Sequence, residues 1–331
     1  MKNKIVFISA VTKEKTPVLE NMISSLQSEF KCLLVIYKHK EIFSFIKSSL
    51  SYILKTKSKK ALFFVGIQSL PILFLTQFLN NEKYYWALEN YKFKLFNSSL
   101  SQKILFFEYL ICWRKITLIV PSKYRAAFYN SKQYKNTIII ENTQPLGKKF
   151  KNRILDNKKV KFVMYGRLSN DDIYLEEFIR IVGKFQYLAE LHLIGWDFLL
   201  SDLISPYNNI FYHGSIEHSS LISFLDEFDV SIIGYRPYKF NNKYCAPNKL
   251  YEAFSISLPV LANTLNPPLF DIISTYKCGV LTDFSNLDEH FEIIINELRQ
   301  NYDYYKSSCY KAYVEKYNFD NYYNQLALKA K

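Results

Sequence analysis

The chain has 331 residues, a length that predicts two domains at about 100–200 residues each. Hydrophobic residues make up 49% and charged residues 22%, a composition that excludes wholesale disorder. The net charge of +13 is uneven: residues 1–150 contain 24 basic and 8 acidic side chains, whereas residues 151–331 contain 19 and 22. The first half therefore either meets an anionic partner, such as a membrane surface or a nucleic acid, or carries a solvated lysine-rich surface.

The cysteines and histidines give no sign of a structural metal. Five of each are scattered along the chain, without a CxxC pair or metal-ligand spacing. This pattern favours a reducing, cytoplasmic compartment and a protein without a metal site. The amino-terminal sequence MKNKIVFISA has too short an apolar stretch for a signal peptide and predicts a first strand instead.

Short apolar strands alternate with helical segments along the whole chain. Strands are expected at 5–9, 32–37, 61–65, 84–88, 117–120 and 137–141, and then at 161–165, 191–195, 210–213, 230–234, 260–263 and 279–281. Helices are expected between them, for example at 17–30, 172–188, 219–228, 248–257 and 287–301. This alternation predicts an α/β fold of parallel, doubly wound sheets covered by helices on both faces.

One uncharged run, residues 61–79, reaches the length of a membrane span. Polar residues and a proline interrupt it, however, and it divides into a strand to residue 65, a turn at Gly66 and a helix from about Ser69. A strand buried on both faces also reads as a continuous apolar run, so we favour a strand followed by a helix. A helix that touches a bilayer without crossing it remains open.

Two alternating stretches meet at the polar, basic segment 147–159, which is the expected linker. We expect an N-terminal domain over residues 1–150, a C-terminal domain over 151–310, and a terminal helix over 311–331 that crosses back to the N-terminal domain. Doubly wound sheets bind ligands beyond the carboxyl ends of their strands, so two facing sheets imply a cleft between the domains.

Gly166 and Arg167 follow the strand expected at 161–165, at the edge where such a sheet receives ligands. An arginine offers a fixed fork of donors suited to phosphate. The dipeptide alone is a weak signal, because a surface arginine in a turn explains it at least as well.

The segment APNKLYEAF, residues 246–254, predicts a helix that Pro247 and Asn248 open. Lys249 and Glu252 share one face of this helix, while Leu250 lies on the core-facing stripe. The positive end of a helix attracts an anion, and Lys249 adds a full charge. Glu252 could accept hydrogen bonds from vicinal hydroxyls, as in a ribose. The pair suits a nucleoside diphosphate, and a surface ion pair is the alternative.

Further landmarks follow in order through the second half: YGRLS (165–169), LHLIG (191–195), residues 210–237, APNKLYEAF (246–254), LPVLAN (258–263) and CGVLTD (278–283). Together they resemble the donor-binding domain of GT-B glycosyltransferases of the group 1, or family 4, type. The resemblance implies two Rossmann-like domains, a nucleotide-diphosphate sugar as donor, retention at the anomeric carbon, and neither a metal nor another cofactor. It gives contact with the donor diphosphate to Arg167 and contact with the ribose to Glu252. The expected donor-binding residues are Gly166, Arg167, Asn248, Lys249, Leu250 and Glu252.

This sequence departs from the family pattern at four places, one of which is the absence of the usual glycine-rich loop after the first strand of the N-terminal domain. Tyr244 stands eight residues before Glu252, where the family has the first glutamate of its E-x7-E motif. The lysine expected a few residues after the GR arginine is missing, and we hypothesise that Lys249 replaces its charge. Asn266-Pro267-Pro268 replaces a Gly-Gly loop, which removes two backbone donors.

The first half resembles the acceptor domains of this group through YYWALENY (84–91), LIVPSKYRAAF (118–128) and IENTQP (140–145). Glu89 follows the end of a strand, so its carboxylate is expected to orient or deprotonate an acceptor hydroxyl. A strand-end glutamate in solvent is the competing interpretation.

These features predict a glycosyltransferase that uses a nucleotide-sugar donor and a glycan or lipid-linked acceptor in bacterial cell-surface polysaccharide synthesis. Glu89, Arg167 and Lys249 are the expected catalytic residues. The basic half is expected to attach peripherally to an anionic membrane surface on its cytoplasmic face. A transferase-like subunit without activity is one alternative. A nucleic-acid-binding protein is another, but the sequence contains no recognised nucleic-acid module, so no nucleic-acid partner is expected.

Overall fold

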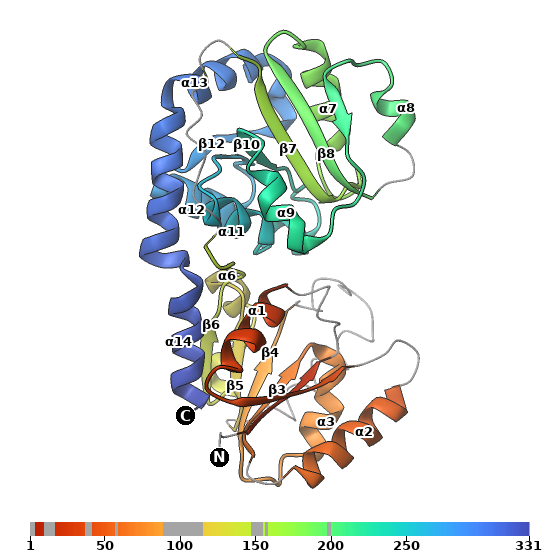
Figure 1. Cartoon of the computed structure of the whole chain (residues 1–331), viewed down its shortest axis with the longest axis vertical. Coiled ribbons are helices and arrows are strands. Elements are labelled where there is room, and N and C mark those ends of the chain that lie inside the picture. The colour runs from red at the N-terminus through yellow and green to blue at the C-terminus, as the bar shows by residue number, and fades with distance from the viewer. Residues whose placement is uncertain are drawn as a thin grey trace. The chain divides into compact units, whose positions relative to one another are not determined.

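The computed structural model describes residues 4–9, 17–36, 42–56, 59–88, 115–146, 155, 158–196 and 200–330. The chain divides into two compact units: unit 1 comprises residues 1–142 and 319–331, and unit 2 comprises residues 143–318. Each unit is built around a six-stranded sheet, and every strand pair is parallel (Figure 1). The expected α/β fold with two doubly wound sheets is confirmed.

The sheet of unit 1 has the strand order β2-β1-β3-β4-β5-β6. Its strands are β1 Lys4–Ser9, β2 Lys31–Ile36, β3 Lys59–Val65, β4 Glu82–Trp86, β5 Thr117–Val120 and β6 Asn136–Ile139. Its helices are α1 Pro17–Leu26, α2 Ile42–Lys55, α3 Leu70–Leu75, α6 Lys123–Ala126 and α14 Phe319–Ala330.

Helices cover both faces of this sheet because successive strand side chains point to opposite sides. Ile5 and Phe7 of β1 pack in a core with residues of α1 and α14, whereas Val6 and Ile8 pack in a second core with residues of α2 and α3. Figure 1 shows α1 and α14 on one side of the sheet, with α2 and α3 on the other.

The sheet of unit 2 has the strand order β12-β11-β10-β7-β8-β9, which is that of the Rossmann fold. Its strands are β7 Val160–Arg167, β8 Ala189–Trp196, β9 Ile210–Tyr212, β10 Val230–Ile233, β11 Val260–Asn263 and β12 Gly279–Thr282. Its helices are α7 Leu175–Lys184, α8 Leu200–Ile204, α9 His218–Leu225, α10 Phe240–Lys243, α11 Asn248–Ser255, α12 Pro267–Tyr276 and α13 Leu287–Ala312.

The direction of winding in unit 2 reverses between the neighbouring strands β7 and β10. Doubly wound sheets bind ligands at such a switch point, beyond the carboxyl ends of the strands. Here the loops that begin at Leu168 and Gly234 therefore lie where a ligand is expected.

The apolar run 61–79 forms β3, a turn at Gly66 with φ +79°, and then α3, as expected. Within the described part of the chain, no helix has both the length and the apolar character needed to cross a membrane. Most of the expected linker, 147–159, lies outside the described residues, and the boundary between the units falls at residues 142 and 143.

Candidate anion site at the switch point of unit 2

Two glycines face each other near the carboxyl ends of β7 and β8. Gly166 and Gly195 are register partners, and a Cβ on Gly195 would lie 1.9 Å from the Gly166 carbonyl oxygen. Gly166 itself has φ +96°, a left-handed conformation that side chains disfavour. Gly166, the residue before the last one of β7, therefore exposes its backbone to solvent, and it has no side chain to cover it.

The ammonium of Lys249 lies against this glycine. A Cβ on Gly166 would be 3.2 Å from Lys249 Nζ, and Nζ donates a 2.9 Å hydrogen bond to the Tyr235 hydroxyl. The Tyr165 hydroxyl also donates to the Lys249 carbonyl, at 3.1 Å, which joins the end of β7 to the first turn of α11. Burial disfavours the charged form of Lys249, but Tyr235 and Glu252 outweigh this effect and hold its pKa above the ordinary value. The site therefore keeps a full positive charge.

Glu252 is buried behind Lys249, with 3% of its surface exposed. Its Oε1 lies 3.2 Å from Nε2 of His218, the first residue of α9. Burial and the nearby Glu252 carboxylate together raise the pKa of Tyr165 well above its ordinary value. The carboxylate is thus held in place by its surroundings, and it does not form the surface ion pair with Lys249 that spacing alone allowed.

Unlike Lys249, whose ammonium lies against Gly166, Arg167 has a largely exposed side chain. Its side chain is 62% exposed, and its Nη1 lies 3.4 Å from Oδ2 of Asp172. The guanidinium also lies 5.6 Å from the ring of Trp196, its register partner on β8. These contacts hold the guanidinium at the edge of the sheet, next to the glycine that Lys249 approaches.

The other expected site residues do not all lie at the anion site. Asn248 is the first residue of α11, but Pro247 takes the cap position and no side chain caps the helix. Leu250 is fully buried in the apolar core, and its N–H donates to the Pro247 carbonyl at 3.1 Å. It is therefore not brought to the anion site. Glu89 lies outside the described residues.

The departures from the family pattern have structural consequences. Tyr244 packs its ring on Phe240, with the ring centroids 4.6 Å apart. Pro267 and Pro268 begin α12, where the first N–H groups have no intrahelical acceptor in any case. Consequently α12 offers fewer backbone donors to an anion than α11, whose first residues Asn248 and Lys249 both retain an N–H.

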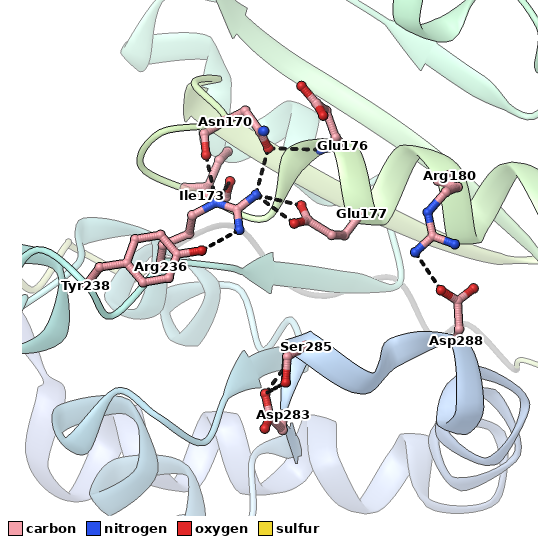
Figure 2. Close-up of polar contacts among 10 residues, drawn as sticks. All are labelled: Asn170, Ile173, Glu176, Glu177, Arg180, Arg236, Tyr238, Asp283, Ser285 and Asp288. Carbon is pink, nitrogen blue, oxygen red and sulfur yellow. Dashed lines mark hydrogen bonds and ion pairs between the residues drawn. The ribbon is translucent and has the colours of Figure 1, made fainter.

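A buried arginine that the sequence did not single out organises the loops beside the site. Arg236 donates to the carbonyls of Asn170 and Ile173, at 2.7 and 3.0 Å, and to the Tyr238 hydroxyl at 2.7 Å. Its Nη2 donates to Asn170 Oδ1 and to both carboxylate oxygens of Glu177 (Figure 2). Arg236 thereby joins the loop after β10 to the loop after β7, which begins directly after Arg167.

No group of three or more His, Cys, Asp or Glu side chains suited to a metal ion occurs among the described residues. Among the described residues, the charged side chains around Gly166 include the cations Arg167 and Lys249 and the carboxylates of Asp172 and Glu252, and Asp172 also pairs with Lys239 at 2.7 Å. This arrangement can neutralise a diphosphate at the backbone of Gly166 and can accept hydrogen bonds from hydroxyl groups beside it.

The fold matches that of several solved proteins. Sucrose-phosphate synthase from Thermosynechococcus elongatus gives a TM-score of 0.75 at 13% identity, over 99% of this chain and 98% of that chain. HepE from Anabaena, in complex with UDP and glucose, gives 0.72 at 11% identity, over 99% of each chain. TarM gives 0.62 at 19% identity, over 86% of this chain and 57% of its own.

These matched proteins are GT-B glycosyltransferases, and the chain has the GT-B fold. At sequence identities of 11–19%, the similarity to these solved structures establishes only the fold of this chain. No protein-family model matches the sequence, and no curated protein matches it either.

Proposed function

We propose that the protein is a glycosyltransferase that transfers a sugar from a nucleoside-diphosphate donor to an acceptor hydroxyl. The observation that carries this proposal is the Lys249 ammonium against Gly166, at the switch point of a GT-B fold, with Glu252 buried on the same helix. The structures of HepE in complex with UDP and with UDP-glucose support a uridine nucleotide as the first donor to test.

In the proposed reaction, the bond between the anomeric carbon and the diphosphate oxygen breaks as the acceptor oxygen bonds to that carbon. Negative charge then accumulates on the leaving nucleoside diphosphate. Lys249, Arg167 and the N-terminus of α11 stabilise it, because fixed charges act most strongly where charge develops. With two cations present, we propose that the transfer needs no metal, and the family resemblance implies retention at the anomeric carbon.

Glu252 holds the ribose in this proposal, and unit 1 binds the acceptor. Glu89 orients the acceptor hydroxyl and accepts the proton that it loses as its oxygen bonds to the anomeric carbon. This hydroxyl belongs to a glycan or a lipid-linked acceptor. Cytoplasmic synthesis of a bacterial cell-surface polysaccharide is the proposed setting, supported by the resemblance and by the fold shared with TarM and HepE.

Thermal-shift measurements with UDP, GDP, ADP and TDP test the donor site. We expect one of them to raise the melting temperature of the native protein, and Arg167→Ala and Glu252→Ala to lose that rise while remaining folded. If none of the four stabilises the protein, the donor site is refuted.

The transfer reaction needs a separate test, because Tyr244 stands where the family has a glutamate. The native protein is expected to hydrolyse the sugar nucleotide of the stabilising base slowly, with water as acceptor. Binding of the nucleotide without any hydrolysis or transfer would instead identify a transferase-like subunit that lacks activity.

A further inference from the structure

Helix α2 of unit 1 carries apolar side chains on two separate faces. One face, which includes Phe45 and Ile53, is buried in the core against the sheet. The other follows positions 43, 47, 50 and 54, which share one stripe of the helix, although Leu50 is only partly exposed and packs against the core. On this stripe Phe43 is 84% exposed and Leu54 is 61% exposed, with Lys47 between them.

The neighbouring helix α3 extends this apolar surface. Phe74 and Leu75 are exposed at its end, and Phe78, in the turn that follows, is 73% exposed. Helices α2 and α3 pack side by side on the same face of the sheet (Figure 1). Single exposed apolar residues are common, but a group of large ones on two adjacent helices marks an interaction surface.

The charges around this surface identify its partner. Helices α2 and α3 and the turn after α3 contain two lysines, Lys47 and Lys55, and no Asp or Glu. Lys47 lies within the exposed stripe of α2, and Lys55 is exposed at the end of the same helix. A second copy of this surface would therefore bring like charges together, which opposes self-association. Aromatic and aliphatic side chains mixed with lysines are instead typical of segments that lie in the interface of an anionic membrane.

We propose that the face formed by α2, α3 and the turn after α3 docks onto an anionic phospholipid bilayer, with Phe43, Leu54 and Phe78 inserted between headgroups. Lys47 and Lys55 then contact lipid phosphates beside them. This docking is independent of transfer chemistry, so it stands or falls separately from the proposed function.

Flotation with phospholipid vesicles tests the proposal. We expect the native protein to float with vesicles that contain phosphatidylglycerol, but not with pure phosphatidylcholine. For the variant Phe43→Ser/Leu54→Ser/Phe78→Ser, the partition coefficient into the anionic vesicles should fall at least about tenfold, because three large apolar contacts with the bilayer are lost. The matched control Ile293→Ser/Tyr304→Ser/Val314→Ser removes three exposed apolar side chains from unit 2 and should float like the native protein.

Three results would overturn the proposal. The native protein could remain at the bottom of the gradient with anionic vesicles. The triple variant of α2 and α3 could float as well as the native protein, which would leave the lysines alone as the cause of binding. Sedimentation equilibrium could show a native dimer that this triple variant loses, which would make a second copy the occupant of the surface. Circular dichroism of all variants establishes that each is folded.

Discussion

The guanidinium of Arg236 donates to both carboxylate oxygens of Glu177, at 2.7 and 2.8 Å, although 59 residues separate them in sequence. Because Arg236 is buried and also donates to two carbonyls, a hydroxyl and Asn170 Oδ1, a lysine cannot replace it. Arg236→Lys should lower the free energy of unfolding by about 2–4 kcal/mol, since it leaves buried acceptors without partners. Urea denaturation measures this change.

Arg180, which lies on the same helix as Glu177, provides the control (Figure 2). Arg180 pairs with Asp288 at 2.5 Å, but both side chains are well exposed. Exposed pairs contribute little, so Arg180→Lys should change the free energy of unfolding by less than about 1 kcal/mol. Equal effects of the two substitutions would show that the Arg236 contacts do not join the loops.

The contact between Lys249 and Gly166 can be tested by adding a single methyl group. Gly166→Ala places a Cβ 3.2 Å from Lys249 Nζ in a backbone with φ +96°, so it should both strain the loop and displace the ammonium. Gly214→Ala is the matched control, because Gly214 has φ +69° but no atom within 4 Å of the added Cβ. Both should lose about 1–2 kcal/mol of stability, whereas only Gly166→Ala should weaken binding of the nucleoside diphosphate. Isothermal titration calorimetry separates the two effects.

Removing the charge of Lys249 without changing its bulk gives a sharper test of catalysis. Lys249→Met should lower turnover of the sugar nucleotide on the order of 10²–10³-fold, because the leaving diphosphate loses a fixed charge. Lys311→Ala removes an exposed lysine of α13 and should leave turnover unchanged. Full activity of Lys249→Met would remove this residue from the reaction.

The pair formed by His192 of β8 and His213, the residue after β9, predicts a loss of stability in acid. His192 Nδ1 lies 3.0 Å from His213 Nε2, and burial, followed by His213 and Lys161, lowers the pKa of His192 from 6.5 to about 4. Between these two pH values the unfolded chain binds a proton that the folded protein does not. The free energy of unfolding should therefore fall as pH drops from about 6.5 to about 4, by about 3 kcal/mol from this residue.

Substitution isolates this contribution from that of the carboxylates. His192→Gln should flatten the dependence of the unfolding free energy on pH across that window, as measured by urea denaturation at several pH values. His290→Gln changes an exposed histidine of α13 and should leave the native slope. An unchanged slope in His192→Gln would contradict the prediction.

The sequence predicted the fold better than the site, for a physical reason. The twelve strands of the described residues were all expected near their observed positions, because strands buried on both faces of a parallel sheet are short apolar runs. Gly166 near the end of β7 and the helix at 248–255 were also expected, because both depend on local sequence.

Contacts between distant segments could not be predicted in the same way. Nothing near Arg236 in sequence indicates that its partners are Asn170, Ile173 and Glu177, because only the pairing of β10 with β7 brings them together. The same holds for His218, which meets Glu252 across 34 residues. Leu250 was expected in the donor site as part of a motif, although its apolar side chain favours the core that it occupies.

The chain leaves unit 1 at residue 142, builds all of unit 2, and returns to unit 1 only at residue 319. Unit 2 is therefore complete in sequence when α14 is still being synthesised, and it can fold during translation without waiting for later residues. Unit 1 begins earlier, yet part of its core comes from Phe319 and Leu326 of α14. Unit 1 therefore cannot complete its core until α14 has been synthesised, although most of its residues are translated first.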